Sequence, residues 1–306
     1  MTKRVNDFMT VLMNDATTFE QYRSLLFAIA YRMLGGVAEA EDMVQETFLR
    51  WQRQAGEEIQ SAKAWLTTII TRLCIDHLKS ARHQREQYVG VWLPEPMVET
   101  NNEDPARAAE LADSLTNAFL LIIETLSPVE RAVFLLREVF DYDFSEVSRI
   151  VDKSEANCRK MAARAREHLT ARRPRFQANP DHAGQLLERF LRATEQGDSE
   201  ALLNLLTEDA AIYSDGGGKV TAVHYPVLGA AKVARFFINI QRLRQRTQAV
   251  IQARFTTINA EPGLLLFRND KLEQSMTFEL AEGRIRAVYI VRNPDKLKHL
   301  THQPAN

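Results

Sequence analysis

Apolar positions recur with a helical period in the middle of the chain. Residues 127–130, Ser-Pro-Val-Glu, form a capping box with proline at the first helical position, so a helix is predicted to begin there. A second, shorter apolar stripe runs from Phe144 to Val151, and a third helix is predicted from Glu155. The predicted inward positions are Val133, Phe134, Leu136 and Phe140, then Phe144, Val147, Ile150 and Val151, then Ala156, Cys158, Ala162, Ala165 and Leu169.

A short polar connection joins the second and third of these helices. Asp152 can adopt the left-handed conformation that a tight turn needs, and Ser154 can cap the helix that follows. Two helices with such a turn, the second one basic, are typical of a helix-turn-helix that reads the major groove of DNA. An all-α packing unit with a solvated basic face would show the same spacing. The outer face of the third helix carries Asn157, Arg159, Lys160, Arg164 and Arg166.

Two further amphipathic helices are predicted nearer the start of the chain. One begins at Ala38, after a pair of glycines breaks an earlier apolar stripe, and acidic and amide residues lie on its exposed side. The other runs from Ser61 to about Gln84 and carries several basic residues outside its apolar face. Residues 17–85 are therefore expected to form a helical domain.

The last third of the chain has a different pattern. An amphipathic helix is predicted from Leu186 to near Gly197, and Asp198 can cap a second helix that includes Leu202, Leu203, Leu205 and Leu206. Helices followed by a curved antiparallel sheet predict an α+β roll that can enclose a pocket between sheet and helices. The predicted strands are 250–258, 264–267, 274–280 and 284–291, with turns at Glu261-Pro262-Gly263, Asn269-Asp270 and Glu282-Gly283.

Composition narrows the class of protein. With 306 residues, two or three domains are expected, and a net charge of −1 means that nucleic-acid contacts must come from local clusters. Residues 159–175 are such a cluster, with seven Lys and Arg side chains against one Glu. Cys74 and Cys158 fall on predicted buried helix faces, which fits a reducing compartment. No segment is long and apolar enough to span a membrane, so a cytoplasmic protein is expected.

These blocks resemble a known family. LSPVERAVFLLREVFDYDFSEVSRIV with SEANCRKMAARAREHL is similar to region 4 of the extracytoplasmic-function sigma factors. GGVAEAEDMVQETFLRWQRQ with AWLTTIITRLCIDHLKSAR is similar to their region 2, and the two blocks occur in the family's order over roughly residues 17–170. Asp152 stands where glycine is usual and Cys158 where valine is usual, and neither breaks the pattern. The resemblance implies two all-α sigma domains, with core RNA polymerase and promoter DNA as partners.

The resemblance also implies a role for each helical face. The helix that begins at Ala38 would dock on the polymerase largest subunit, although without the family its acidic face reads as solvated surface. The helix from Ser61 would hold an unstacked base of the −10 element, and Arg72 stands where many relatives carry asparagine, which leaves the preferred base open. Two of its cations are expected to neutralise phosphates. The implied residues are Asp42, Gln45, Glu46 and Arg50 for polymerase; Arg72, Asp76, Lys79 and Arg82 for the −10 element; and Ser154, Asn157, Arg159, Lys160 and Arg164 for the −35 element.

Residues 86–109 form a linker of unusual composition. It carries Tyr, Val, Trp and Leu close together beside two prolines, so some other surface should bury Trp92. A hydrophobic patch on the neighbouring helices is one such surface. Alternatively, WLPEP resembles the signature of the sigma-factor group with a fused SnoaL-like domain, and two later motifs, DGGGK and NPDKL, support that group, although the three glycines also suit a hairpin tip. The residues of the three motifs are Trp92, Leu93, Pro94, Glu95 and Pro96; Asp215, Gly216, Gly217, Gly218 and Lys219; and Asn293, Pro294, Asp295, Lys296 and Leu297.

That group implies regulation by the chain's own C-terminal domain. Tethering raises the effective concentration of such a domain to roughly millimolar, so weak contacts suffice. WLPEP is expected to dock on DGGGK and NPDKL and to hold the two DNA-binding domains too close to span the −10 and −35 elements. Core polymerase or a pocket ligand would favour the open state. The expected domains are region 2 at 1–85, the linker at 86–109, region 4 at 110–175 and the SnoaL-like domain at 181–306.

A small-molecule sensor, or a polyketide-cyclase-like enzyme with a helix-turn-helix head, is the alternative. Such cyclases move protons with a carboxylate and a histidine, and Asp215 with His224 is the pair that this sequence offers. The spacing of that pair carries no mechanistic signature. The sequence also has no metal-ligand spacing, phosphate-binding glycine loop or nucleophile elbow, so no enzyme activity and no cofactor are expected.

Overall fold

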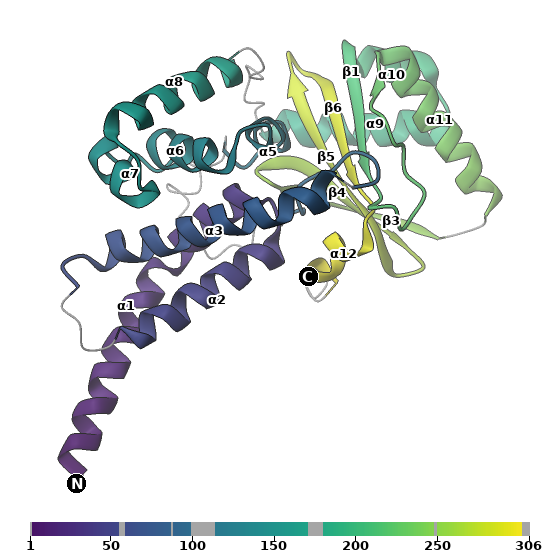
Figure 1. Cartoon of the computed structure of the whole chain (residues 1–306). Helices are drawn as coiled ribbons and strands as arrows, with labels where there is room; N and C mark the ends of the chain where they lie inside the picture. Colours follow the sequence, from purple (N-terminus) through teal and green to yellow (C-terminus); the bar gives the residue numbers. More distant parts are fainter. Residues whose placement is uncertain are drawn as a thin grey trace. The chain divides into compact units, whose positions relative to one another are not determined.

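The first half of the chain is helical and the second half combines helices with one sheet, as the apolar pattern predicts (Figure 1). The computed structural model describes residues 2–54, 59–86, 88–98, 114–170, 180–247 and 250–301. The chain divides into two units, Met1–Glu86 with Ile122–Arg172, and Gln87–Leu121 with Arg173–Asn306. Among the described residues, no helix combines the length and the apolar character needed to cross a membrane.

Three helices form the first part of the first unit. α1 (Thr2–Leu34) ends at Gly35, whose φ of 74° is a left-handed conformation that glycine adopts at little cost. α2 (Val37–Arg53) and α3 (Ala62–Glu86) each begin one residue from the predicted start. Both cysteines of the chain are free and buried, as predicted, and burial raises the pKa of the Cys74 and Cys158 thiols.

The second part of this unit contains the predicted helix-turn-helix. α6 (Pro128–Glu138) starts with the predicted capping box between Ser127 and Glu130. α7 (Phe144–Val151) ends at Asp152, whose φ and ψ of 55° and 55° are the expected left-handed conformation. α8 (Glu155–Thr170) follows, and Ser154 Oγ accepts the N–H of Asn157 at 3.3 Å. On α8 the predicted inward residues Cys158, Ala162, Ala165 and Leu169 are buried, whereas Ala156 is exposed.

α3 packs against α6 and α7 within this unit. The hydroxyls of Thr67 on α3 and Tyr142 before α7 lie 2.8 Å apart, and both side chains are buried. Arg131 of α6 donates to the carbonyl of Met33 at the end of α1, at 2.6 Å, and so satisfies a carbonyl with no partner inside its own helix. The helices of predicted regions 2 and 4 thus share one packed unit.

The second unit is built around a six-stranded sheet. The strand order is β2-β1-β6-β5-β4-β3, with β1 parallel to β6 and the other neighbours antiparallel. Asp198 caps the second helix through the N–H groups of Glu200 and Ala201, as predicted. The elements are α9 (Pro180–Gln196), α10 (Ser199–Leu205), β1 (Leu206–Asp215), β2 (Val227–Leu228), α11 (Ala230–Arg246), β3 (Ile251–Ile258), β4 (Glu261–Arg268), β5 (Lys271–Ala281), β6 (Arg284–Val291), α12 (Pro294–Leu297) and the 3-10 turn η1 (Lys298–Leu300).

Both faces of this sheet are covered. On one, the helix face, the rings of Phe190 on α9 and Phe237 on α11 pack edge to face with centroids 4.8 Å apart, over Phe278 of β5. Figure 1 shows α9, α10 and α11 beside these strands. On the other, the linker face, apolar side chains from β4 and β6 pack with Leu93 of the linker and Ala118 of α5 (Asn117–Glu124). The core of the second unit therefore includes part of the linker and the start of the helix that opens predicted region 4.

One predicted turn is wrong. Glu261, Pro262 and Gly263 open β4, and the turn before them is made by Asn259 and Ala260, with φ of 53° and 58°. Pro262 is tolerated because it lies one residue before the β4–β5 ladder begins, so no partner strand needs its missing N–H. The turns at Asn269-Asp270 and Glu282-Gly283 are confirmed.

One predicted helix end also differs, since Leu206 begins β1 and does not belong to α10. The sequence before Ser127 also predicts a helix over residues 111–124. The helix observed there, α5, begins at Asn117 after turns at residues 114–116, and Leu111 itself lies outside the described residues. The apolar pattern did not predict β1 or α11.

Candidate regulatory and nucleic-acid-binding sites

Residues 88–98, here called the docked linker, lie against the side chain of Asp215. This carboxylate ends β1, is fully buried, and accepts four hydrogen bonds. Buried charges persist only when such partners are present. Two of the four donors belong to the docked linker, so the solvation of Asp215 depends on it. The donors are the Tyr88 hydroxyl and the Gly217 N–H to Oδ1, and the Leu93 N–H at 2.9 Å and the Lys296 ammonium at 2.8 Å to Oδ2.

Lys296 of α12 brings the opposite charge to the same place. The residue is 7% exposed, and its ammonium also donates to the carbonyl of Leu93. The same nitrogen lies 4.3 Å from the ring centroid of Trp92, a cation–π contact that contributes about 0.5–2 kcal/mol. Lys296 therefore contacts both Asp215 and the WLPEP segment.

Residues 216–219, here called the glycine loop, include three glycines that lie so close to neighbouring residues that a side chain on them would collide. Gly217 and Gly218 have φ of 59° and 67°, the left-handed region that glycine tolerates. A Cβ on Gly217 would lie 2.2 Å from Asn293 Nδ2, and one on Gly218 would lie 3.3 Å from the Cβ of Val89. The loop thus approaches NPDKL on one side and the docked linker on the other.

Side chains of NPDKL complete this contact. Asn293 caps α12 by accepting the N–H of Asp295 at 3.1 Å, and its Nδ2 donates to the Tyr88 hydroxyl at 3.0 Å. Lys219 of the glycine loop forms an ion pair with Asp295. Burial, followed by the hydrogen bond to Asp215, raises the pKa of Tyr88, so its hydroxyl keeps its proton.

The far end of the docked linker is held by backbone hydrogen bonds. The carbonyl of Pro96 accepts from His299 Nε2 at 2.8 Å, so that nitrogen carries a proton. Met97 exchanges two hydrogen bonds with Asn259, its N–H donating to Oδ1 at 2.8 Å and its carbonyl accepting the Asn259 N–H at 2.9 Å. Val98 then bridges to Ile258 at the end of β3.

The structure thus brings WLPEP, DGGGK and NPDKL together. Leu93 and Leu297 share the apolar cluster of the linker face, and Pro94 and Pro96 are buried while Glu95 is half-buried. Sequence reasoning did not name Tyr88, Asn259 or His299 as part of this site. The cluster of aromatic and apolar residues in the linker was the available signal for Tyr88, whereas Asn259 and His299 belong to no recognisable pattern.

The residues predicted to meet the −10 element belong to α3, in the first unit. Arg72 donates from Nε to the carbonyl of Ile150 at 2.9 Å and from Nη2 to that of Arg149 at 3.0 Å, near the end of α7. Asp76 and Lys79 are exposed and pair with each other at 3.1 Å. The side chain of Arg82 lies outside the described residues. One of the four predicted residues is therefore engaged by a helix of predicted region 4.

The predicted polymerase-binding face on α2 is accessible. Asp42 and Gln45 are exposed, and Glu46 and Arg50 are partly exposed and form an ion pair at 2.9 Å. A surface pair at this spacing contributes only about 0.3–0.5 kcal/mol, so its side chains remain available to a partner. These four residues form one mixed acidic and polar strip along the helix.

The predicted −35 residues all lie on exposed positions of α8 or its cap. Arg159 pairs with Glu155 at 2.8 Å and lies over the ring of Phe144, 5.1 Å from its centroid. In the described part of the chain, neither Lys160 nor Arg164 takes part in an ion pair, so their charges are free to meet phosphates or bases. Ser154 and Asn157 are exposed beside them.

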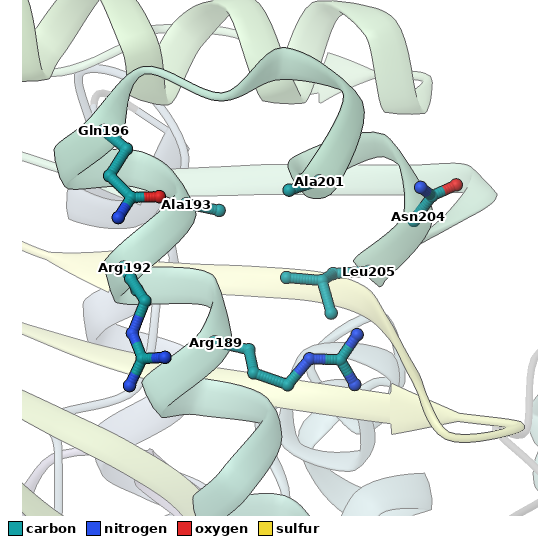
Figure 2. Close-up of a pocket in the computed structure, with 7 residues that line it drawn as sticks. All are labelled: Arg189, Arg192, Ala193, Gln196, Ala201, Asn204 and Leu205. Atoms are coloured by element: carbon teal, nitrogen blue, oxygen red, sulfur yellow. The ribbon is translucent and has the colours of Figure 1, made fainter.

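The carboxylate and histidine that an enzyme would use are not assembled. Asp215 is fully buried, whereas His224 is exposed, and within the described ranges no hydrogen bond joins them. A cavity of about 280 Å³ in this domain is lined by α9 and α10, with Arg189 extending from α9 toward Leu205 (Figure 2). The space between these helices and the sheet is packed with apolar side chains.

Comparisons with known proteins identify the family of this chain. Residues 18–84 match the family Sigma-70 region 2, and residues 116–169 match Sigma-70, region 4. The ECF RNA polymerase sigma factor SigJ of Mycobacterium tuberculosis is 34% identical over 293 residues, which cover 92% of this chain and 93% of SigJ. The probable ECF RNA polymerase sigma factor SigI of the same species is 29% identical over 287 residues, covering 93% and 95%.

A solved structure extends the likeness to three dimensions. The crystal structure of the Mycobacterium tuberculosis extracytoplasmic function sigma factor SigJ superimposes with a TM-score of 0.73 at 30% identity, and the match covers 92% of this chain and 98% of that chain. Both sigma-70 regions occur in order, and the relationship to SigJ continues through the C-terminal domain. The chain therefore belongs to the ECF RNA polymerase sigma factors.

Proposed function

We propose that this chain directs RNA polymerase to a set of promoters and that its C-terminal domain restrains this activity by holding the docked linker. The observation that carries the restraint is the buried carboxylate of Asp215, which takes two of its hydrogen bonds from Tyr88 and Leu93. A buried carboxylate that loses half of its donors is strongly disfavoured, so the domain has an intrinsic preference for the docked linker. Its place of action is the cytoplasm, where RNA polymerase meets promoter DNA.

The helical faces supply the promoter-directed part of the proposal. The strip formed by Asp42, Gln45, Glu46 and Arg50 on α2 is proposed to dock on core polymerase. α3 is proposed to hold the −10 element and α8 the −35 element, with Lys160 and Arg164 as the cations most available for DNA. Because Arg72 donates to carbonyls of α7, it must leave them before it can contact the −10 element.

The restraint acts through the reach of the chain between regions 2 and 4. A free linker behaves as a flexible coil whose mean span grows with the square root of its length. Docking residues 88–98 on Asp215 and Lys296 removes those residues from the free length. Core polymerase then favours the undocked state because only that state lets both DNA-binding domains reach their elements.

Run-off transcription with purified core polymerase and the full-length chain tests both parts. Trp92→Ala removes the ring over Lys296, and a loss of about 1 kcal/mol should raise promoter-specific transcription roughly fivefold. Lys160→Ala and Arg164→Ala should lower it tenfold or more and reduce the salt dependence of promoter binding. Arg235 is an exposed arginine on α11, so Arg235→Ala is the matched control. It should change neither promoter-specific transcription nor the salt dependence of promoter binding.

Two results would contradict the proposal. Unchanged transcription with Lys160→Ala and Arg164→Ala would exclude α8 as the promoter-binding helix. Lower transcription with Trp92→Ala would show that the docked linker assists the polymerase complex instead of restraining it. Spin labels at residues 40 and 160 give an independent measurement, because undocking should lengthen and broaden their distance distribution.

A further inference from the structure

A buried acidic side chain of the sheet lies at the start of α5. Glu261, the first residue of β4, is 6% exposed, and its Oε2 accepts both the N–H and the Nδ2–H of Asn117, each at 2.9 Å. Asn117 is 2% exposed and is the first residue of α5. Its Nδ2 also donates to the hydroxyl of Thr277 on β5 at 2.7 Å. The first turn of α5 is thus bonded to two neighbouring strands.

The chemistry of a helix start explains why an acid fits here. The first N–H groups of a helix have no partners inside the helix, and the helix dipole favours negative charge at that end. Thr116 takes one of these groups, accepting the N–H of Phe119 at 3.3 Å. Glu261 takes the N–H of Asn117, from a position 144 residues further along the chain. Glu261 therefore acts as a cap supplied by another part of the fold.

Glu261 depends on α5 for its partners. In the described part of the chain, both hydrogen bonds of its carboxylate come from Asn117. Burial raises the pKa of this carboxyl to about 7, the Asn117 bonds oppose that rise, and the nearby Glu279 adds to it. Without α5, this carboxylate would lose both donors, which is unfavourable wherever the surrounding apolar side chains keep it from water. The carboxylate of Glu261 therefore has its hydrogen-bond donors only when α5 is bound.

Apolar contacts surround the polar pair. Ala118 and Leu121 of α5 belong to the same cluster as Leu265 of β4 and Tyr289 of β6. Leu93 of the docked linker lies in that cluster too. The linker face therefore binds two separate segments of the chain, WLPEP near Asp215 and the first turn of α5 near Glu261.

We propose that the linker face carries a second docking site, made by Glu261, Thr277 and the surrounding apolar side chains, whose occupant is the first turn of α5. This inference rests on the proposed restraint by the docked linker and deepens it, because the chain between regions 2 and 4 is then held near both ends. A free segment of about 30 residues spans roughly 30 Å, whereas a segment tied at both ends contributes almost no reach. Release of WLPEP alone leaves α5 bound, so full release requires both sites to open.

Hydrogen exchange at single-residue resolution on the full-length chain tests the site directly. The first amide of a helix ordinarily exchanges freely, whereas that of Asn117 should be protected in the unmodified protein. Glu261→Ala should speed its exchange at least tenfold while residues 88–98 stay within twofold. Glu261→Gln keeps an acceptor oxygen and should stay within threefold of the unmodified protein. An Asn117 amide that exchanges equally fast in all three proteins would overturn the site.

A second variant covers the case in which Glu261→Ala disturbs the sheet. Faster exchange of the β5 and β6 amides would show that Glu261→Ala disturbs the sheet. In that case Asn117→Ala tests the site instead, because residue 117 lies on the helix and not on the sheet. It removes the side-chain donor and should speed exchange of residues 117–121 several-fold with β5 and β6 unchanged. No change in residues 117–121 would contradict the site.

Transcription separates this inference from the proposed function. Trp92→Ala should raise promoter-specific transcription roughly fivefold and Glu261→Ala should raise it by a smaller factor. The double variant should exceed the product of the two single increases, because the contact that remains in each single variant still restrains the chain. If exchange changes as expected and transcription does not, the docking site stands and the proposed restraint fails. If Trp92→Ala raises transcription and Glu261→Ala changes neither exchange nor transcription, the restraint stands and the second site fails.

Discussion

The carboxylate of Asp215 and the ammonium of Lys296 lie 2.8 Å apart, with side chains 0% and 9% exposed. Removing two charges from water is costly, and their attraction compensates only when further hydrogen bonds satisfy both groups. Here the docked linker supplies such bonds to each partner, through the Leu93 N–H to Asp215 and the Leu93 carbonyl to Lys296. The pair and the linker therefore stabilise each other.

Replacing only Lys296 should destabilise the protein more than the removal of both charges of the Asp215–Lys296 ion pair would suggest. Lys296→Met leaves Asp215 charged and buried, and it should lower the free energy of unfolding by about 3–5 kcal/mol. The double variant Asp215→Asn with Lys296→Met removes both charges and should lose less than the sum of the two single losses. Urea unfolding of the full-length variants measures these differences. Strictly additive losses would argue against coupling between the two side chains.

Alanine at a loop glycine should act differently from alanine at a helix glycine. Gly217→Ala places a Cβ against Asn293 and keeps a positive φ, so a loss of at least about 1–2 kcal/mol in unfolding free energy is expected. Gly184→Ala on α9 meets nothing within 4 Å and should stabilise by roughly 0.5–1 kcal/mol. Thermal unfolding compares the two. Equal effects would mean that the loop does not approach Asn293 closely.

The buried acid at β4 predicts a pH dependence with a definite sign. The pKa of Glu261 is raised from 4.5 to about 7, so between these values the folded state binds more protons than the unfolded state. Stability should therefore fall as pH rises from about 5 to 8, by on the order of 3 kcal/mol at most for this group. Glu279 and the Tyr289 hydroxyl that donates to it lie on neighbouring strands and belong to the same charge environment.

The matched variant isolates Glu261 from other titrating groups. Glu261→Gln cannot ionise, so its unfolding free energy should exceed that of the unmodified protein at pH 8 and vary less between pH 5 and 8. Urea unfolding at several pH values gives both curves. The assignment to Glu261 is wrong if the two curves keep the same slope throughout this range.

Arg72 should carry two separable roles. Its bonds to the Ile150 and Arg149 carbonyls hold α3 against α7, and its exposure limits their net value to roughly 1 kcal/mol. Arg72→Ala should speed amide exchange at the end of α7 and, because the −10 contact is lost too, lower transcription. The double variant Thr67→Val with Tyr142→Phe removes a buried bond between the same elements without touching a proposed DNA residue. This double variant should speed amide exchange in α7, and its promoter-specific transcription should equal or exceed that of the unmodified protein.

Local signals were sufficient for the helical half of the chain. The capping box at Ser127, the left-handed turn at Asp152 and the cap at Ser154 involve residues within one helical turn, so their chemistry is readable from the sequence. Two predicted helix starts, on α2 and α3, were one residue from the observed ones. The core-facing stripes decide these elements, and distant parts of the chain change them little.

The sheet was harder to predict because its elements depend on distant partners. β1 contains exposed Glu208 and Asp209 at an irregularity in its pairing with β6, which interrupts the alternation that marks a strand. A Pro-Gly pair normally signals a turn, yet Pro262 and Gly263 lie in β4 because the preceding Asn259 and Ala260 already make the turn.

The site could be predicted in part, for a similar reason. The three motifs were recognisable as units, and the structure places them in contact. The roles of Tyr88, Asn117 and Glu261 arise only from folding, since each bonds to a residue more than a hundred positions away. A single glutamate before a proline carries no sign that it caps a helix elsewhere.

The shared apolar cluster of the linker face has a consequence for protein engineering. Leu93 and Ala118 complete a core whose other buried members follow residue 250. A chimera that grafts residues 181–306 onto an unrelated sigma factor would leave that core open to water, and precipitation is the expected outcome. A cassette that also carries residues 88–98 and 114–121 should keep this core closed and remain in solution, so these two segments and the C-terminal domain form one transferable piece.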